Sequence, residues 1–353
     1  MPVCTIQGQT IPPGVRTLRI ENDLLSATIL LDKGADIYEL IYKPIGIDVL
    51  WKSPWGLRQT GRGVPTAFQS EAAWLEYYAG GWQGIFPNGG PACIYKGVEL
   101  NFHGEASVVP WNYETVRTEE DDFAEVLLSA RLFRSPFRIE RRMRVEAGLP
   151  QLIIQECITN EGGEPMDYMW GHHPAYGSPF LSEACRIDIG AAAFRADDTY
   201  PGTVNPLTPG ASYTWPIAAK DGAEVDMSQV PGPAEPRDIL AYFEEFESGW
   251  YGITNTHLGV GVGLVWPREV FPYAWFWQEM YGSVGFPWYK SVYVMAIEPF
   301  TTFPGQGLVT AMEKTGSHCT LDPGKSVEVE LRAVFYESKT GIKRIEADGT
   351  VII

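Results

Sequence analysis

Basic residues are scarce in this chain of 353 residues, in which 27 lysines and arginines stand against 44 aspartates and glutamates. The formal net charge of −17 repels phosphate backbones and anionic lipid headgroups. No apolar run approaches the length of a membrane span, and residues 1–14 lack the basic segment and apolar stretch of a secretory signal. We therefore expect a neutral ligand, no nucleic-acid partner and no membrane.

Cysteine is also sparse, with five residues and no Cys-x-x-Cys pair among them. An odd, dispersed set is typical of free thiols in a reducing compartment, and the sequence has no Asn-x-Ser/Thr glycosylation site. We therefore expect a cytoplasmic protein. A Gly-x-Ser-x-Gly elbow and a phosphate-binding loop in its usual context are missing too, which argues against that class of hydrolase and against nucleotide binding.

What the sequence does have is alternation of apolar and polar residues, the pattern of β-strands. Residues 24–31 and 37–41 flank a turn and are predicted to pair. Residues 137–145 place apolar side chains at 137, 139, 143 and 145 on one face, and charged side chains at 138, 140, 142 and 144 on the other. We interpret the basic run there as a solvated strand face. Further strands are predicted over 151–159, 259–266, 273–279, 290–298 and 326–335.

Helical signals are few, and residues 67–78 are the best candidate. With 37 glycines and 27 prolines punctuating many short strands, the sequence predicts an all-β fold, a large antiparallel β-sandwich. Sandwiches of this size form single units, so we expect one domain over residues 1–353. Residues 197–237 are rich in Pro, Gly and Asp, and we interpret them as a long loop over one face of the domain.

Glu298 is the most informative acidic residue, because it ends a strand that is apolar on both alternating faces. Such a strand is expected to be central and buried, and Pro299 holds Glu298 in an extended conformation. A carboxylate in that position is costly unless it is paired, hydrogen-bonded or used in chemistry. Partial desolvation would raise its pKa toward the range of a general base, and a structural ion pair is the alternative reading.

Three of the five histidines lie in motif-like contexts: His103 in Asn-Phe-His-Gly-Glu, and His172 and His173 in Gly-His-His-Pro. Consecutive residues of an extended segment point to opposite faces, so at most one of the pair easily faces a given pocket. Buried histidines can serve as core residues or as acid–base groups. A metal site built from His103, Glu105 and one of the pair is a further alternative, although no His-x-His, His-Glu-x-x-His or cysteine cluster supports it.

The segment 266–293 is strongly aromatic, and most of its rings must belong to the core. Alternation sends some of them to the opposite face, where Trp277 lies beside Gln278 and Glu279. Aromatic rings next to amides and carboxylates suit sugars, which have apolar C–H faces and hydroxyl edges. A carbohydrate is therefore the expected small-molecule ligand.

Several motifs together resemble the aldose 1-epimerase (galactose mutarotase) family. They are His-Gly-x-Ala at 103–106, Trp111, His-Pro at 173–174 and Ile-Glu-Pro at 297–299, preceded by a hairpin with a Gly-Ala turn at 34–35. The resemblance covers most of the chain in the right order. It implies a large antiparallel β-sandwich and ring opening of a cyclic hemiacetal at C1.

The resemblance also implies roles for individual residues. Glu298 would be the general base on the anomeric hydroxyl, His173 the general acid on the ring oxygen, and His103 would hold or polarise that oxygen. The expected substrate-binding residues are His172, Asn88, Gln83, Trp277 and Gln278. This chemistry requires no cofactor and no metal. The usual arginine of the family near Asn88 is a glycine here, which favours a neutral sugar.

Two alternatives to a mutarotase stay open at the level of sequence. One is a non-catalytic carbohydrate-binding protein with the same fold. The other is a metal-dependent sugar isomerase or lyase that uses His103, Glu105 and one histidine of the 172–173 pair. The choice between His172 and His173 as the acid also stays open, and a homodimer is compatible with the sequence.

Overall fold

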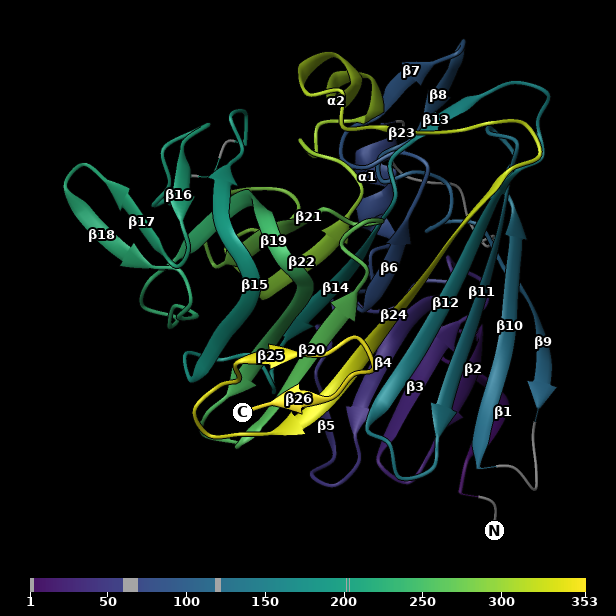
Figure 1. Cartoon of the computed structure of the whole chain (residues 1–353), viewed down its shortest axis with the longest axis horizontal. Helices are drawn as coiled ribbons and strands as arrows, with labels where there is room; N and C mark the ends of the chain where they lie inside the picture. Colours follow the sequence, from purple (N-terminus) through teal and green to yellow (C-terminus); the bar gives the residue numbers. More distant parts are fainter. Residues whose placement is uncertain (1–2, 60–68, 118–121, 201, 203) are drawn as a thin grey trace.

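The computed structural model describes residues 3–59, 69–117, 122–200, 202 and 204–353, and most of its regular structure is β-strand (Figure 1). All but one of its strand pairings are antiparallel, and the exception is a single bridge between Arg237 and Tyr281. One sheet of 18 strands contains nearly all of the long elements. The predicted all-β, antiparallel architecture is confirmed.

The first layer of the sandwich is a run of neighbouring antiparallel strands that ends at β20. In order across the sheet, they are β9 (Asn112–Arg117), β10 (Phe123–Arg131), β11 (Phe137–Glu146), β12 (Gln151–Asn160), β24 (Ser326–Glu337) and β20 (Val260–Trp266). Strands β10, β11 and β12 carry the alternation that the sequence predicted. Their inward residues are buried, because every second side chain faces the opposing layer.

The second layer holds the most buried strands of the fold. In order, they are β1 (Thr5–Ile11), β2 (Val15–Glu21), β3 (Leu25–Leu30), β4 (Asp36–Tyr42), β6 (Trp82–Ile85), β14 (Gly171–Gly177), β22 (Tyr293–Phe300) and β21 (Tyr273–Met280). All seven residues of β14 are buried, as are seven of the eight in β22. Both strands are therefore central. Strand β22 starts at Tyr293 rather than at the predicted residue 290, because residues 282–292 form a loop.

The two layers are joined by one long strand, β19 (Arg237–Asn255). Its first part pairs with β21 of the second layer and its last part pairs with β20 of the first. Strand β15 (Cys185–Ala196) follows β19 along most of its length. Elsewhere the two layers face each other: β2 contacts β10 and β11, and β3 contacts β12. The apolar core lies between the layers.

The remaining elements decorate the sandwich. Helices α1 (Ser70–Glu76) and α2 (Leu308–Lys314) lie with the hairpin of β7 (Cys93–Tyr95) and β8 (Val98–Leu100) at one end of the layers, at the top of Figure 1. The short pieces β5 (Ile47–Asp48), β13 (Met166–Tyr168), β23 (Cys319–Leu321), β25 (Arg344–Ile345) and β26 (Val351–Ile352) complete the described elements. Helix α1 is shorter than the predicted 67–78, and residues 67 and 68 lie outside the described residues. Across the described ranges, no helix is long and apolar enough to cross a membrane.

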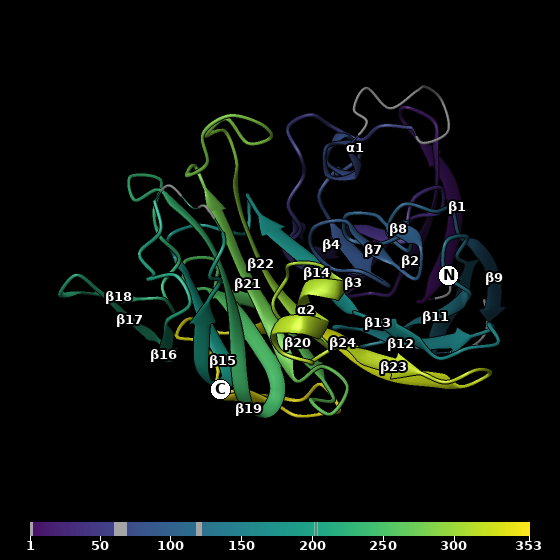
Figure 2. The same ribbon diagram turned by 90° about the horizontal axis from the view of Figure 1, so that it is seen from above.

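The expected loop over residues 197–237 is partly wrong. It contains β16 (Ser212–Thr214), β17 (Ile217–Lys220) and β18 (Ala223–Asp226), because short alternating segments there pair with β15 and with each other. The hairpin of β17 and β18 projects to one side of the sandwich in Figure 1 and in Figure 2. Only the beginning of this segment reaches the candidate site.

Candidate active site

A cavity of about 590 Å³ opens at the end of the second layer that carries α1. Its floor is formed by side chains of β14, β21 and β22, and its walls by α1, by the loop after β15 and by the loop between β21 and β22. The volume lies within the range of about 300–1,000 Å³ that is usual for small-molecule sites. Of the sequence-predicted residues, His103, His173, Trp277 and Glu298 line this cavity.

His173 and Glu298 lie opposite each other on neighbouring strands. The register of β14 against β22 pairs Gly171 with Phe300 and Ala175 with Ala296, which places position 173 beside position 298. Opposed residues of an antiparallel pair point to the same face. The His173 Nε2 and Glu298 Oε1 atoms are accordingly 3.8 Å apart, with the two side chains 7% and 2% exposed. This separation is longer than a hydrogen bond.

Burial moves the pKa values of these two groups in opposite directions. Desolvation raises the pKa of Glu298 well above its usual value, and it lowers the pKa of His173 to about 4, with the Lys33 ammonium adding to the latter effect. Within the described chain, the buried Oε2 of Glu298 and Nδ1 of His173 have no hydrogen-bond partner. A strong proton acceptor and a strong proton donor therefore face the same cavity.

His103 reaches the cavity from a strained turn. Its backbone has a φ of 57°, and the next residue, Gly104, also has a positive φ of 72°. A side chain at Gly104 would lie 2.2 Å from the Phe86 carbonyl oxygen, so the His-Gly pair in the motif has a steric reason. The Gly90 N–H donates to Nδ1 of His103 at 3.2 Å. Because that nitrogen accepts, and because burial lowers the pKa of His103 well below its usual value, the ring is neutral with its proton on Nε2.

Aromatic and acidic side chains form the wall beside the acid–base pair. The ring of Trp277 lies 5.7 Å from that of His173, and its Nε1–H donates to the hydroxyl of Tyr200 at 3.3 Å. Asp238, the second residue of β19, lines the same wall, and its Oδ2 accepts from the Ser283 hydroxyl at 2.8 Å. Its buried Oδ1 finds no donor among the residues that the structure describes. This wall can therefore accept hydrogen bonds from hydroxyl groups of a ligand.

Ser283 links Asp238 to a second buried carboxyl, that of Glu279. A hydroxyl group has one hydrogen to donate, so both contacts are satisfied when Glu279 carries a proton and donates to Ser283. Burial and the charge of Asp238 raise the pKa of Glu279, in agreement with that assignment. Oδ1 of Asp238 is then the oxygen of this group that has no partner among the described residues.

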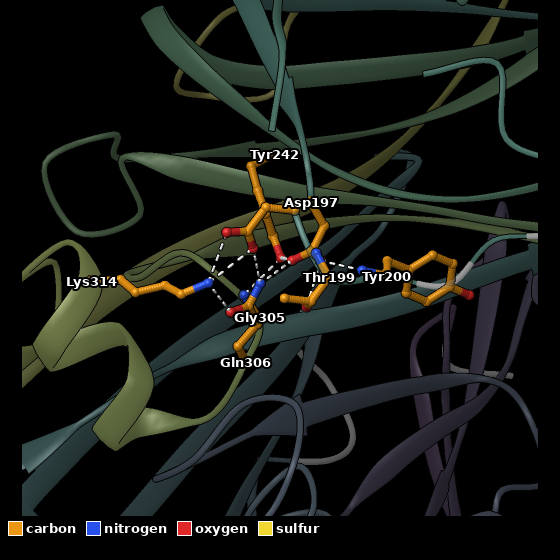
Figure 3. A network of polar contacts seen from close by, with 8 residues as sticks. Asp197, Thr199, Tyr200, Tyr242, Gly305, Gln306 and Lys314 are labelled. Atoms are coloured by element: carbon orange, nitrogen blue, oxygen red, sulfur yellow. Dashed lines mark hydrogen bonds and ion pairs between the residues drawn. The ribbon is translucent and has the colours of Figure 1, made fainter. Parts of the chain in front are cut away.

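The loop that carries Tyr200 is held by Asp197 (Figure 3). Oδ1 of Asp197 accepts from the backbone N–H groups of Thr199 and Tyr200, at 2.7 and 2.6 Å. Its Oδ2 accepts from the hydroxyl of Tyr242 and from the amide of Gln306. Because the hydroxyl of Tyr242 also accepts from the Gly305 N–H at 2.9 Å, one carboxylate ties two cavity loops to β19.

His172 lies on the opposite face of β14, as alternation predicted. Its Nε2 is 3.2 Å from Glu156, and its Nδ1 accepts from the indole N–H of Trp82 at 3.2 Å. Glu156 also pairs with Arg141. Burial acts to raise the pKa of that carboxyl, but the Arg141 charge, followed by His172, lowers it to about 2. The predicted substrate-binding role of His172 does not fit this position, because the side chain is part of a buried ionic network beneath the sheet.

Three further predicted substrate-binding residues are engaged away from the cavity lining. Gln83 pairs with His173 across the sheet, but its amide donates to Asp36 and to the Gly80 carbonyl. Asn88 organises its own loop through the carbonyl groups of Pro91 and Asn101. The Gln278 side chain takes the face of β21 opposite to Trp277, where its Oε1 accepts from Arg237 at 3.4 Å. None of the three lines the cavity, and each amide has at least one protein partner.

The alternative metal site does not assemble. The carboxylate of Glu105 accepts from the backbone N–H groups of Phe133 and Arg134, at 3.0–3.1 Å, and so is turned to another loop. His172 lies on the far side of β14 from His103. Over the described parts of the chain, no group of three or more His, Cys, Asp or Glu side chains is arranged to hold a metal ion.

Several cavity residues were missed by the sequence analysis. They are Trp74 and Tyr78 around α1, Tyr200 in the loop after β15, Asp238 at the start of β19, and Trp288 in the loop between β21 and β22. Trp288 belongs to the aromatic segment that the sequence singled out. Asp238 shares a strand face with Leu240, so an acid at the start of an apolar strand was the available signal for it.

A family model described as "Domain of unknown function (DUF4432)" matches residues 13–334. Among solved structures, a galactose mutarotase-like protein from Clostridium acetobutylicum has 16% sequence identity and a TM-score of 0.65, over 95% of this chain and 99% of that chain. A galactose mutarotase-like protein from Lactobacillus casei ATCC 334 has 16% identity and a TM-score of 0.59, over 91% and 100%.

A galactose 1-epimerase from Lactobacillus acidophilus NCFM has 9% identity and a TM-score of 0.60, over 96% of this chain and 100% of that chain. No curated protein matches the sequence. At these identities the likeness establishes the fold, so the predicted galactose mutarotase-like β-sandwich is confirmed.

Proposed function

The chain belongs to the family described as a domain of unknown function (DUF4432), and we propose that it is a sugar mutarotase that interconverts the anomers of an aldose. The observation that carries this proposal is the pairing of His173 with Glu298 on the floor of the cavity. Hemiacetal ring opening needs one group that removes a proton from the anomeric hydroxyl and one that protonates the ring oxygen. A buried carboxyl and a buried imidazole with oppositely shifted pKa values supply both.

In the proposed mechanism, the pair holds one proton, which rests on Glu298 and passes to Nε2 of His173 to form the reactive state. Glu298 removes the proton from the anomeric hydroxyl, and the C1–O1 bond becomes a carbonyl. The bond between C1 and the ring oxygen breaks, and the ring oxygen takes the proton of His173. The raised pKa of Glu298 and the lowered pKa of His173 favour the neutral pair that this step produces. Rotation about C1–C2 and reclosure in reverse order give the other anomer.

His103 contributes a neutral hydrogen-bond donor in this mechanism. Its ring lies 5.9 Å from that of His173, with its Nδ1 occupied by the Gly90 N–H, so Nε2–H is the donor left for the sugar. A neutral donor can hold the ring oxygen without competing as an acid. Trp277 offers a ring face to the C–H side of the pyranose, and the free oxygen of Asp238 accepts from a hydroxyl.

A neutral sugar is the substrate class that the cavity favours. Four acidic residues line it, Glu71, Asp197, Asp238 and Glu298, and none of the described lining residues is a lysine or arginine. A phosphate or carboxylate on the sugar would be desolvated without a cationic partner, which is unfavourable. The proposed reaction uses only groups of this chain and the substrate.

The test is the rate of anomer exchange for freshly dissolved α-D-glucose, α-D-galactose and α-D-mannose, followed by polarimetry with the uncatalysed rate subtracted. We expect acceleration by the wild-type protein and its loss in Glu298→Gln. If a sugar binds in calorimetry but its anomers exchange at the uncatalysed rate, the protein is a carbohydrate-binding protein rather than an enzyme.

A further inference from the structure

We propose that Tyr78 is an additional catalytic residue, whose phenol donates a hydrogen bond to the anomeric oxygen while Glu298 removes the proton from that oxygen. This inference rests on the proposed mutarotase function and adds to it a specific donor for O1. Tyr78 lines the cavity together with His173 and Glu298, and no motif in the sequence marks it.

The position of Tyr78 is fixed by the aromatic side chains around it. Its backbone N–H donates to the Leu75 carbonyl just after α1, and the residue is 4% exposed. Its ring stacks on Trp74 at 4.7 Å, lies 5.5 Å from Trp51, and meets the ring of His173 edge-on at 5.7 Å. A side chain packed on three sides loses little additional freedom when it binds a ligand.

The hydroxyl group of Tyr78 is buried, and it has no hydrogen-bond partner anywhere in the described chain. Other buried tyrosines of this fold are paired: Tyr176 bonds Tyr251 at 2.7 Å, and Tyr242 bonds Asp197. Leaving a buried hydroxyl unpaired costs free energy, because water has been removed without replacement. An unpaired group on a cavity wall is therefore expected to find its partner in the ligand.

Electrostatics determine which role this hydroxyl can play. Burial, followed by the charges of Glu298 and Asp36, raises the pKa of Tyr78 well above its usual value. A phenol with a raised pKa keeps its proton, and it acts as a hydrogen-bond donor. Tyr78 shares the cavity lining with Glu298, and its ring lies 5.7 Å from that of His173, whose Nε2 is 3.8 Å from Glu298. The phenol and the carboxyl can thus contact the same oxygen of the substrate.

A neutral donor at O1 suits the chemistry of ring opening. As Glu298 withdraws the proton, negative charge develops on O1 before the C=O bond is complete. A donor that is already in place in a water-poor site stabilises this charge without reorganisation, as in an oxyanion hole. Removal of one such donor lowers kcat by about 10²- to 10³-fold in known enzymes.

The experiment compares Tyr78→Phe with Tyr113→Phe, a control on the exposed part of β9, in the assay with D-glucose, D-galactose and D-mannose. We expect Tyr78→Phe to lower kcat at least tenfold with an unchanged melting temperature, and Tyr113→Phe to leave kcat unchanged. Binding of each sugar and of its 1,5-anhydroalditol, which lacks O1, is then measured by calorimetry. Tyr78→Phe should weaken binding of the sugar only, because the anhydro compound has no O1 with which the Tyr78 hydroxyl could form a hydrogen bond.

Two results would overturn the role of Tyr78. One is a kcat in Tyr78→Phe equal to that of the wild type. The other is equal weakening of the sugar and its anhydro analogue, which indicates a packing role instead. If the wild-type protein binds the sugars but does not exchange their anomers, the mutarotase proposal fails. The binding comparison between sugar and anhydro compound still tests the contact of Tyr78 with O1 in that case.

Discussion

Glu298 Oε1 and His173 Nε2 are 3.8 Å apart at opposed positions of two central strands, with both side chains almost fully buried. This geometry places a carboxyl and an imidazole on one floor, at a separation that leaves them free to bond a ligand rather than each other. Burial raises the pKa of Glu298 and lowers that of His173, so the pair favours its neutral form.

The buried Glu298 should reduce the stability of the protein as the pH rises. Its folded-state pKa lies above the unfolded value of about 4.3, so the folded state holds a proton that the unfolded state has lost. Stability is therefore lost as the pH rises from about 4.3 through the folded-state pKa. Glu298→Gln, which does not titrate, should melt at least as high as the wild type at pH 7.

The measurement is a pair of melting curves for wild type and Glu298→Gln at pH 4 and at pH 7. The melting temperature of the variant, relative to that of the wild type, should be higher at pH 7 than at pH 4. A variant that is less stable at pH 7 would show that the carboxylate is stabilised in the fold by a partner. Burial would then not be the dominant effect on its pKa.

The two adjacent histidines should behave differently when each is replaced by asparagine. His173→Asn should lose about 10²-fold or more in kcat, the usual range for acid–base groups, with little change in the melting temperature. His172→Asn should lower the melting temperature instead, because it removes a partner of the buried Glu156. Both variants are assayed for anomer exchange at a temperature where circular dichroism shows them folded. An inactive, folded His172→Asn would contradict the assignment of the acid.

The pKa values of His173 and Glu298 should determine how the rate of anomer exchange depends on pH. One proton is available between about pH 4, the pKa of His173, and the raised pKa of Glu298. Below this window Glu298 cannot accept a proton, and above it His173 cannot donate one. The value of kcat/KM should therefore fall on both sides of this window. A fall that begins at pH 6.5 on the acid side would show that His173 keeps its ordinary pKa.

Neutral sugars should bind in preference to their phosphorylated forms. The cavity is lined by Glu71, Asp197, Asp238 and Glu298, and the described lining contributes no cation to balance an anion. Saturation-transfer NMR on matched pairs, D-glucose with its 6-phosphate and D-mannose with its 6-phosphate, should give the stronger signal for the neutral member. A clear preference for the phosphates would contradict the account of the cavity and require a cationic contact.

Strand-level features of this molecule could be predicted from the sequence because they depend on local periodicity. The alternation around Glu298 predicted a buried central strand, and the consecutive His172 and His173 predicted that only one faces the pocket. Both features follow from the period of two in an extended chain. The fold class follows from the same periodicity repeated along the chain.

Features that depend on distant partners were not predictable in this way. Arg141 shares the inward face of β11 with Phe137 and Met143, where its charge is balanced by Glu156 on the next strand. Gln83 is opposed to His173 and so shares its face of the sheet, but its amide donates to Asp36, 47 residues away in sequence. Tyr78 reaches the cavity because it follows the end of α1 at a point where its ring meets that of His173 in β14. Each of these outcomes requires knowledge of which segments meet in space.

The central claim is that the pair formed by Glu298 and His173 catalyses anomer exchange. The most direct measurement is magnetisation exchange between the α and β anomeric protons of D-glucose, D-galactose and D-mannose, at equilibrium, with wild type and with Glu298→Gln. We predict enzyme-dependent exchange for at least one sugar. In the folded variant, the exchange rate should be lower by about 10²-fold or more. Equal exchange rates for the two proteins, at equal sugar binding, would contradict the claim.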